Sequence, residues 1–310
     1  MIQVTFLGTS AAVPTVDRNV SALMIQRAGE SLLFDCGEGT QRQMMRYGTG
    51  FLVNEIFLTH YHTDHTLGIP GLLRGMSMQA RTAPLRFYGP RGADRQIGQL
   101  VALGMDRTKF PVEITELKPG DVLSRGDYDL VVGEASHRGE CLAYALVEHE
   151  RLGRFDPELA RSLGIPEGPL WGKLHRGEAV PDATGRMVTS EALVGPARRG
   201  RKVVYSGDTV PCESVRALAQ GADLLIHEAT FGADEKERAL ETRHSLASEA
   251  AMVARDAGVR RLYLTHISAR YSREAPELAS QARAIFPETT IARDGLIVEV
   301  GFGDDTVVSS

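Results

Sequence analysis

The stretch that decides the fold lies between residues 56 and 65 and reads Ile56-Phe57-Leu58-Thr59-His60-Tyr61-His62-Thr63-Asp64-His65. A strand-like apolar run is followed by three histidines and one aspartate within six positions. Imidazole and carboxylate groups are standard ligands of zinc. Residues two apart in an extended segment face the same way, so His60 and His62 can bind one ion, and Asp64 and His65 can reach a second. A solvated loop, or histidines satisfied by backbone carbonyls, is the alternative that this density disfavours.

Polar residues also follow other strand-like runs. The runs 32–34, 130–132, 203–206 and 262–265 precede Asp35, His137, Asp208 and His266 respectively. Helical patterns lie between some of these runs, at residues 212–220 and, more clearly, 245–257. Alternating strands and helices with polar residues at strand ends predict a layered α/β domain with one catalytic edge. His137, Asp208 and His266 are therefore candidates for the remaining ligands.

The composition is that of a globular chain with a sizeable core: 310 residues, 43% apolar and 24% charged. No apolar run approaches the ~20 residues that span a bilayer, and residues 1–6 resemble a strand rather than a signal peptide. Cys36, Cys141 and Cys212 are too few and too widely spaced for a disulfide framework or a thiolate zinc site. We expect a reducing, cytoplasmic compartment. The net charge of −5 argues against a protein that coats nucleic acid over its whole surface.

One segment breaks the α/β rhythm. From about residue 148 to residue 201 the chain is rich in glycine and proline and lacks apolar periodicity. We expect a single domain, 1–310, with an inserted arm at about 148–201. Residues 151–202 hold 10 basic and 6 acidic side chains, against 25 and 34 in the remainder. This distribution predicts an acidic body and a basic arm, which permits a localised grip on nucleic acid.

Taken together, these motifs resemble a known family. The H-x-H-x-D-H cluster, Asp35 in a D-C-G turn, His137, the Gly207-Asp208 turn and His266 resemble the five motifs of the metallo-β-lactamase superfamily. Within that superfamily the chain is very similar to the ribonuclease Z family, and the likeness extends over essentially all 310 residues. Its fold would be an αβ/βα four-layer sandwich with a two-metal site on one edge and a protruding flexible arm. Further matching segments are 6–9, 203–209, 227–231, 264–268 and 294–296.

The resemblance also implies roles for individual residues. Asp64 would accept a proton from the attacking water as well as bind metal, and His244 would be the general acid for the leaving oxygen. The family's H-S-T motif reads His244-Ser245-Leu246 here, so the histidine is retained and the threonine is lost. Asp35, His227 and Glu228 would support the site without binding metal. The implied ligands are His60, His62 and His137 for the first zinc, Asp64, His65 and His266 for the second, and Asp208 for both.

RNA contacts are implied in three places. The family's P-x-K-x-R-N loop reads Pro14-Thr15-Val16-Asp17-Arg18-Asn19, so the lysine is missing while Arg18 and Asn19 remain. Arg270 lies a few residues after a ligand and would contact the RNA near the scissile phosphate, although a surface salt bridge explains it equally well. In the arm, the implied phosphate contacts are Lys173, Arg176, Arg198, Arg199 and Arg201. The family's arm presents tRNA to the active site of the dimer partner, which implies a homodimer.

The implied function is a zinc-dependent endoribonuclease, a hydrolase that removes the 3′ trailer of precursor tRNA and leaves a 3′-hydroxyl on the tRNA. It would use two Zn²⁺ per subunit, no organic cofactor and no membrane partner. The main alternative is a relative with the same metals that acts on small phosphodiesters or sulfate esters, but such a relative would lack the long basic arm. A catalytically silent RNA-binding protein is disfavoured by the intact ligand set.

Overall fold

The structure is a computed structural model that describes residues 1–104, 107–271 and 274–302. The chain forms two compact units, one of Met1–Val147 with Arg201–Ser310 and one of Glu148–Gly200. We call the first the body and the second the arm. No helix among the described residues combines the length and the hydropathy needed to cross a bilayer.

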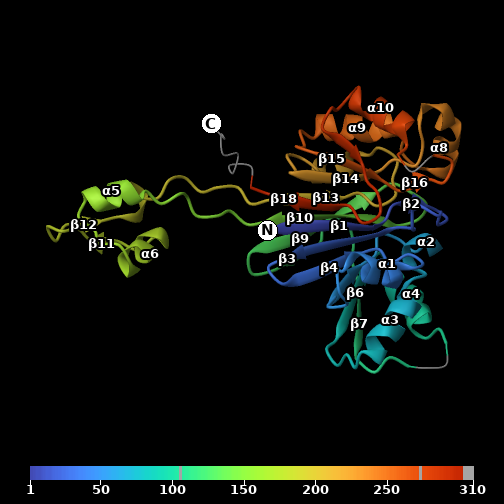
Figure 1. Cartoon of the computed structure of the whole chain (residues 1–310), viewed down its shortest axis with the longest axis horizontal. Helices are drawn as coiled ribbons and strands as arrows, with labels where there is room; N and C mark the ends of the chain where they lie inside the picture. Colours follow the sequence, from blue (N-terminus) through green and yellow to red (C-terminus); the bar gives the residue numbers. More distant parts are fainter. Residues whose placement is uncertain (105–106, 272–273, 303–310) are drawn as a thin grey trace. The chain divides into compact units, whose positions relative to one another are not determined.

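Two seven-stranded sheets form the centre of the body (Figure 1). The first sheet has the order β18-β1-β3-β4-β5-β6-β7, and β4 to β7 are parallel. Its strands are β1 (Ile2–Gly8), β3 (Ala22–Arg27), β4 (Glu30–Phe34), β5 (Glu55–Phe57), β6 (Leu85–Gly89), β7 (Val112–Glu116) and β18 (Ile297–Val300).

The second sheet has the order β17-β15-β14-β13-β10-β9-β8, in which β13, β14, β15 and β17 are parallel. Its strands are β8 (Val122–Ser124), β9 (Tyr128–Ala135), β10 (Cys141–Glu148), β13 (Lys202–Tyr205), β14 (Leu224–Glu228), β15 (Leu262–Thr265) and β17 (Thr289–Ile291). A short parallel pair, β2 (Ser10–Ala11) with β16 (Ile267–Ser268), brings a loop after β1 beside the loop after β15.

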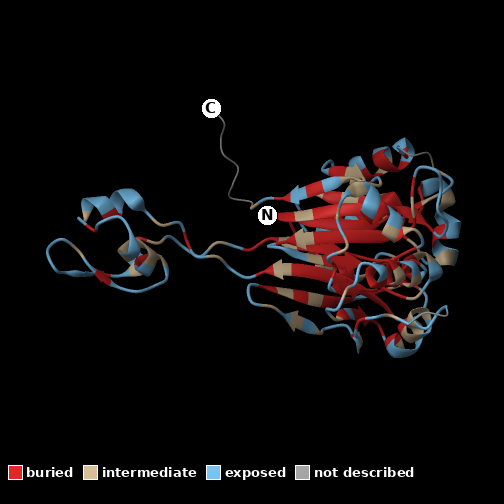
Figure 2. Cartoon of the chain, turned by 60° about the horizontal axis from the view of Figure 1, so that its bottom comes forward, coloured by how far each residue is buried: buried red, intermediate tan, exposed pale blue. Residues whose placement is uncertain are grey.

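Alternation of side chains along the strands gives the body three large cores, and Figure 2 shows buried residues concentrated in its strands. Phe6, Phe34 and Phe57 of the first sheet meet Tyr144 and Ile226 of the second in the central core. The outer face of the first sheet is covered by α1 (Thr40–Tyr47), α3 (Ile69–Met78) and α4 (Ala93–Val101). Helices α7 (Glu213–Leu218), α9 (Ala247–Asp256) and α10 (Pro276–Arg283) cover the second. The predicted four-layer sandwich is confirmed, and α7 and α9 lie within the two predicted helical segments.

The last strand completes the first sheet. Strand β18 pairs antiparallel with β1, with Ile2 opposite Val300. Just before β18, the Asp294 carboxylate accepts hydrogen bonds from Thr9 Oγ1 (2.7 Å), the Asn19 main-chain N–H (2.6 Å) and Gln43 Nε2 (2.7 Å). Residues near the end of the chain therefore fix loops that belong to its first fifty residues.

The arm has ordered helices and strands, although its sequence lacks apolar periodicity. Helices α5 (Pro157–Ser162) and α6 (Pro169–His175) and the hairpin of β11 (Val180–Pro181) with β12 (Met187–Val188) surround a small core. The Asp156 side chain caps α5 by accepting from the Leu159 N–H, and Pro169 starts α6 after Gly168. Too few apolar residues are involved for a periodicity to be visible. The buried apolar residues are Ala160, Ile165, Leu174, Val180, Val188 and Leu193.

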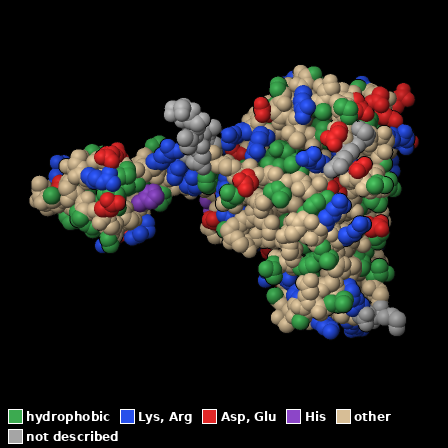
Figure 3. Space-filling model, in the orientation of Figure 1, with side chains coloured by type: hydrophobic (Ala, Val, Ile, Leu, Met, Phe, Trp, Pro, Cys, Tyr) green, Lys and Arg blue, Asp and Glu red, His purple; other side chains and the backbone are tan. Residues whose placement is uncertain are grey.

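The charge of the arm differs from the expectation. Residues 148–200 contain eight basic and eight acidic side chains, so the arm as a compact unit is neutral. The predicted excess depended on Arg201 and Lys202, which belong to the body, and omitted Glu148 and Glu150. Figure 3 shows both signs of charge on the visible face of the arm.

Candidate metal centre

The carboxyl ends of parallel strands bring the polar residues to one edge of the body. Asp35 follows β4, and His60 follows β5 in the same sheet. In the second sheet, His137, Asp208 and His266 follow β9, β13 and β15. The short helix α2 (Thr63–Thr66) turns Asp64 and His65 back toward this edge. The two sheets therefore supply their polar residues to a shared site.

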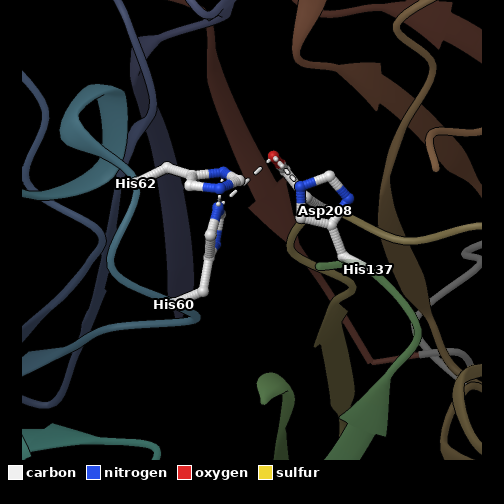
Figure 4. A group of neighbouring side chains, drawn as sticks. All are labelled: His60, His62, His137 and Asp208. Carbon is white, nitrogen blue, oxygen red and sulfur yellow. Dashed lines mark hydrogen bonds and ion pairs between the residues drawn. The ribbon is translucent and has the colours of Figure 1, made fainter. Parts of the chain in front are cut away.

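The first ligand group contains His60, His62, His137 and Asp208, whose candidate ligand atoms all lie within 4.8 Å of one another (Figure 4). His60 Nε2 and His62 Nδ1 are 2.9 Å apart. Asp208 Oδ2 lies 3.6 Å from His60 Nε2 and 4.0 Å from His137 Nε2. Three imidazoles and one carboxylate are a suitable set for a four-coordinate divalent ion.

The second group contains Asp64, His65 and His266. Asp64 Oδ2 lies 3.6 Å from His65 Nε2 and 3.4 Å from His266 Nε2. Asp208 reaches this group as well, because its Oδ1 is 3.4 Å from His65 Nε2 and its Oδ2 is 3.4 Å from His266 Nε2. The carboxylate of Asp208 thus lies between the two groups.

Hydrogen bonds on the far side of four rings set their orientation. His65 Nδ1 donates to Asp35 Oδ2 (2.8 Å), and His137 Nδ1 donates to the Arg243 carbonyl oxygen (2.8 Å). His60 Nδ1 and His266 Nδ1 bond the hydroxyls of Thr59 (3.0 Å) and Thr230 (2.8 Å). Protonation at Nδ1 leaves the Nε2 lone pair directed into the site, which is the form of histidine that binds metal.

Buried polar atoms without partners test whether the site suits a metal. His65 Nε2, His137 Nε2 and Asp208 Oδ1 are buried and have no hydrogen-bond partner. Unsatisfied buried groups of this kind are costly, by roughly 1–3 kcal/mol each. All three are atoms of the two ligand groups and face their interior, so cations bound there would satisfy them.

The electrostatics fit the same interpretation. Burial, together with repulsion from His65, lowers the pKa of His60 well below its usual value, and burial also lowers the pKa values of His62 and His137. Burial opposes ionisation of Asp208, but His266, His65 and His60 outweigh it and hold its pKa well below the usual range. His60, His62 and His137 are therefore neutral imidazoles that can bind a cation without releasing protons. His65 differs: burial opposes its protonation, but Asp208 and Asp35 outweigh burial and raise its pKa well above the usual value, so this ring would release a proton when it binds a cation.

The backbone at this edge is held in uncommon conformations. Asp35 and His266 have φ angles of 56° and 55°, in the left-handed region that few non-glycine residues occupy. Gly207, directly before Asp208, has φ 59°, and a Cβ there would lie 2.8 Å from the Thr59 side chain. Such strain concentrates at functional sites.

Asp35 is fully buried and joins both sheets to the ligand cluster. Besides His65, its carboxylate accepts from the Thr59 N–H (2.8 Å), the Thr59 hydroxyl (3.0 Å to Oδ2) and the Tyr205 hydroxyl (2.9 Å). It is not part of either ligand group. The carboxylate can therefore orient the ligands without binding metal itself.

His244, Glu228 and His227 lie on the second-sheet side. His244 Nδ1 is 2.7 Å from Glu228 Oε1, and the His244 ring lies 4.6 Å from that of His137. Burial opposes protonation of His244, but Glu228 outweighs it and raises its pKa to about 9. Asp208, Glu228, His244 and His266 form a further potential ligand group. His227 belongs to none of these ligand groups; it is fully buried, and its Nδ1 bonds the Glu228 carbonyl oxygen (2.7 Å).

Five of the seven candidate ligands line a cleft of about 540 Å³, namely His62, Asp64, His137, Asp208 and His266. Arg270 lines it and is paired with Glu235 (3.2 Å), so the predicted cleft position and a surface salt bridge occur together. Two further cleft-lining arginines, Arg138 and Arg238, were not predicted. Arg138 follows a ligand directly, and that adjacency was the only signal for it in the sequence.

Arg18 is corrected by the structure. Its side chain is only 3% exposed, and Nη1 donates to Thr9 Oγ1 (2.7 Å) and the Ala292 carbonyl oxygen (2.6 Å). A guanidinium held inside the body cannot contact RNA as predicted. Asn19 is partly exposed, and its side-chain amide donates to the Glu38 carbonyl oxygen (2.7 Å). Val16, at the position of the missing lysine, is fully exposed.

Four of the five predicted RNA contacts of the arm lie on its surface to different degrees. Arg201 instead belongs to the body, where its side chain is buried and Nη1 donates to the Val300 carbonyl oxygen (3.0 Å), which does not fit a phosphate contact. Lys173 on α6 and Arg176 directly after α6 are exposed, and Arg176 pairs with Glu178 (3.4 Å). Arg198 is half-buried and donates to the Leu152 carbonyl oxygen (3.1 Å), whereas Arg199 is exposed. Their contact with RNA stays a prediction.

Comparisons with known proteins agree with the fold. A family model of the anti-Pycsar protein Apyc1 matches residues 2–109, and a model of the beta-lactamase superfamily domain matches residues 179–267. A metallo-beta-lactamase fold protein of Bacillus subtilis, YhfI, has a similar structure, with a TM-score of 0.68, 22% identity and coverage of 96% of this chain and 98% of that one. Fold and ligand clusters together define a member of the metallo-β-lactamase superfamily.

Relatives of nearly the same length narrow the class. Ribonuclease Z of Gemmatimonas aurantiaca is 56% identical over 304 residues, which are 97% of each chain. Ribonuclease Z of Myxococcus xanthus is 52% identical over 98% of this chain and 99% of its own. The crystal structure of human tRNase Z, short form, matches with a TM-score of 0.69 and 28% identity over 97% of this chain and 100% of that one. The chain belongs to the ribonuclease Z family, a class of hydrolytic endonucleases, and the predicted family and enzyme class are confirmed.

Proposed function

We propose that this chain is the endoribonuclease that removes the 3′ trailer of precursor tRNA and leaves a 3′-hydroxyl on the tRNA. The proposal rests on the high sequence identity to ribonuclease Z relatives over nearly the whole chain, combined with two groups of candidate ligands that share Asp208. A cleft with an exposed arginine-bearing wall leads to these ligands, as a polyanionic substrate requires.

We propose two zinc ions as the cofactors. His60, His62, His137 and Asp208 would hold the first ion, and Asp64, His65, His266 and Asp208 would hold the second. Bound zinc supplies hydroxide at neutral pH and neutralises charge on a phosphodiester. The donor set of imidazoles and carboxylates, and the three orphaned atoms among them, support this proposal.

The chain's own residues handle the protons. Asp64 is fixed by the Ala12 N–H, which donates to its Oδ2 (2.9 Å), and it would take the proton of the attacking water. The leaving 3′-oxygen needs a proton in return. His244 lines the cleft, and Glu228 fixes its ring through Nδ1, so that Nε2 is the nitrogen available for donation.

We further propose that the protein acts as a homodimer in the cytoplasm. Met45 on α1 and Met78 at the end of α3 are 68% and 81% exposed. The two helices pack closely, since Gly75 of α3 leaves room for the Gln41 side chain of α1. A contiguous exposed apolar patch is typical of an interface, and we propose that these two methionines belong to one. Sedimentation of wild type and Met45→Glu tests this: a dimer that the substitution weakens is expected, and a monomeric wild type would contradict it.

The decisive test is cleavage of precursor tRNA by the metal-loaded protein, with and without a chelator, and mapping of both product ends. Cleavage at the 3′ end of the tRNA that stops when the metal is removed is expected. An intact precursor alongside rapid turnover of a small phosphodiester would favour the alternative function on small esters.

The arm offers a second test. A protein in which residues 155–195 are replaced by a short Gly-Ser linker should lose precursor cleavage yet retain hydrolysis of a small diester, because the ligands all lie in the body. Loss of both activities, with metal content unchanged, would mean that the arm does not act as a substrate grip.

A further inference from the structure

Helix α8 (Lys236–Thr242) borders the metal cleft and divides its charges between two faces. Arg238 and Thr242, four residues apart, line the cleft. Glu237 and Glu241, also four apart, are exposed but do not line it. Because residues four apart share a face of a helix, the arginine faces the cleft and the two glutamates face elsewhere.

Two other arginines are attached to the same helix. Arg270 Nη1 pairs with Glu235 Oε1 (3.2 Å), directly before α8. Arg138 Nη2 donates to the carbonyl oxygen of Glu241 (3.0 Å), near the end of α8. Their anchor points and Arg238 thus lie at positions 235, 238 and 241; positions 238 and 241 are about 4.5 Å apart along the axis of α8, and Glu235 is its N-cap residue.

Arg238 and Arg138 have unused hydrogen-bonding capacity. Within the described ranges of the chain, the guanidinium of Arg238 has no ion-pair partner, and that of Arg138 has only the carbonyl contact with Glu241. Both are exposed, and both line the cleft beside His137, His244 and Asp208. A guanidinium presents its donors in a planar fork that matches the oxygens of a phosphate.

We infer that Arg138, Arg238 and Arg270 form a row that binds successive backbone phosphates of the single-stranded RNA on either side of the scissile bond. This inference rests on the proposed function, and it adds two substrate-binding residues and a positioning residue, Glu235, which holds Arg270. The row recognises the polyanionic backbone and not the bases, so it would act on any trailer sequence.

The test measures the salt dependence of kcat/KM for precursor tRNA with Arg138→Gln, Arg238→Gln and the double variant. The slope of log(kcat/KM) against log salt concentration is negative, and each lost phosphate contact should reduce its magnitude by about 0.7. The double variant should reduce it by about 1.4. Arg238→Lys keeps the charge and should keep most of the slope. Arg255→Gln, on the exposed side of α9 and paired with Asp256, is the matched control and should keep the wild-type slope.

Three results would overturn the inference. These are a wild-type slope in both single variants, an equal loss of slope in Arg255→Gln, or a loss of bound metal or of thermal stability in the variants that accounts for the change. If the wild type does not cleave precursor tRNA at all, the proposed function fails instead. In that case, binding of a single-stranded oligoribonucleotide, measured by fluorescence anisotropy, tests the row of arginines. The same changes in salt dependence are expected for the binding constant.

The variant Glu235→Gln distinguishes a role of Glu235 in positioning Arg270 from a general effect of its negative charge on RNA binding. The variant removes a negative charge, so a purely electrostatic effect would strengthen RNA binding. If Glu235 holds Arg270 in place, the variant should instead raise KM several-fold with little change in kcat, and Glu235→Asp should restore part of the loss. A lower KM in Glu235→Gln would contradict the positioning role.

Discussion

The two sheets bring the same arrangement to the metal centre from opposite sides. In the first sheet, the buried Asp35 carboxylate bonds His65 directly and reaches His60 through the Thr59 hydroxyl. In the second, the buried Glu228 carboxylate bonds His244 directly, and it accepts from the Thr230 hydroxyl (2.8 Å), which bonds His266. Each side thus has one carboxylate, one threonine and two histidines.

The difference between the two sides lies in one histidine. Both histidines on the Asp35 side, His60 and His65, belong to the proposed ligand sets. On the Glu228 side only His266 does, whereas His244 takes the place that corresponds to His65 and lies at the cleft wall, with its side chain 13% exposed. A carboxylate that holds a histidine can prepare it to bind metal or to donate a proton. We therefore expect Asp35 to prepare its histidine for metal binding and Glu228 to prepare His244 for proton donation.

Asp208 is where the two sides meet, so its removal should have the largest effect. Asp208→Ala would leave both ligand groups without their shared carboxylate, and we expect loss of bound metal and of cleavage to the background level. Metal content by mass spectrometry and product formation on precursor tRNA measure this. Asp223→Ala, at a buried aspartate in the loop directly before β14, is the control for folding.

The next prediction contrasts His65→Ala with His244→Ala. His65→Ala should lower both metal content and activity. His244→Ala should keep the metal but slow single-turnover cleavage by about 100-fold or more, the usual contribution of a general acid. A substrate with a nitrophenolate leaving group needs no proton and should lose much less in His244→Ala. Loss of metal from both variants would break the proposed difference between the sides.

Neutralising the two carboxylates should have intermediate effects. We expect Asp35→Asn to weaken metal binding by about 10–100-fold, as outer partners of metal ligands commonly do. Glu228→Gln should act mainly on kcat, through His244, with a smaller loss of metal affinity. Metal titration by calorimetry and single-turnover kinetics distinguish these outcomes. Equal losses of metal affinity in the two variants would show that the sides are equivalent.

The smallest effect is expected from the two threonines. Thr59→Val and Thr230→Val each remove one relayed hydrogen bond, with a net value of about 1 kcal/mol, or roughly five-fold in metal affinity. The effect on affinity should be similar in both variants, because each threonine holds one ligand. A much larger loss in Thr59→Val would show that its hydroxyl mainly supports Asp35.

The four candidate ligands of residues 60–65 could be predicted from the sequence because they lie within six positions and their spacing is unusual. His137, Asp208 and His266 could be proposed from strand ends, but only the fold shows that these ends share an edge. The hydrogen bonds relayed by the two threonines were not predicted. The Thr230 hydroxyl bonds His266, which is 36 positions away in the sequence, so this contact depends on how the strands lie side by side.

The predictions that failed concern charged side chains. Arg18 stands in a family loop and was predicted to contact RNA, yet the loop folds so that its guanidinium is enclosed. Arg138 and Arg238 belong to no sequence motif. Both line the cleft, and for Arg238 this depends on the face of α8 on which it lies. Whether a charged side chain points outward cannot be inferred from composition.

The pairing of β1 with β18 has a consequence for synthesis of the protein. The partner of residues 2–5 is the segment 297–300, and the carboxylate that fastens residues 9, 19 and 43 belongs to residue 294. At a ribosomal rate of ~5–20 residues per second, the first strand waits about 15 to 60 s for its neighbour. During that time one edge of the first sheet stays open, so the nascent chain exposes an edge strand that the finished enzyme covers, and such an edge can pair with another chain.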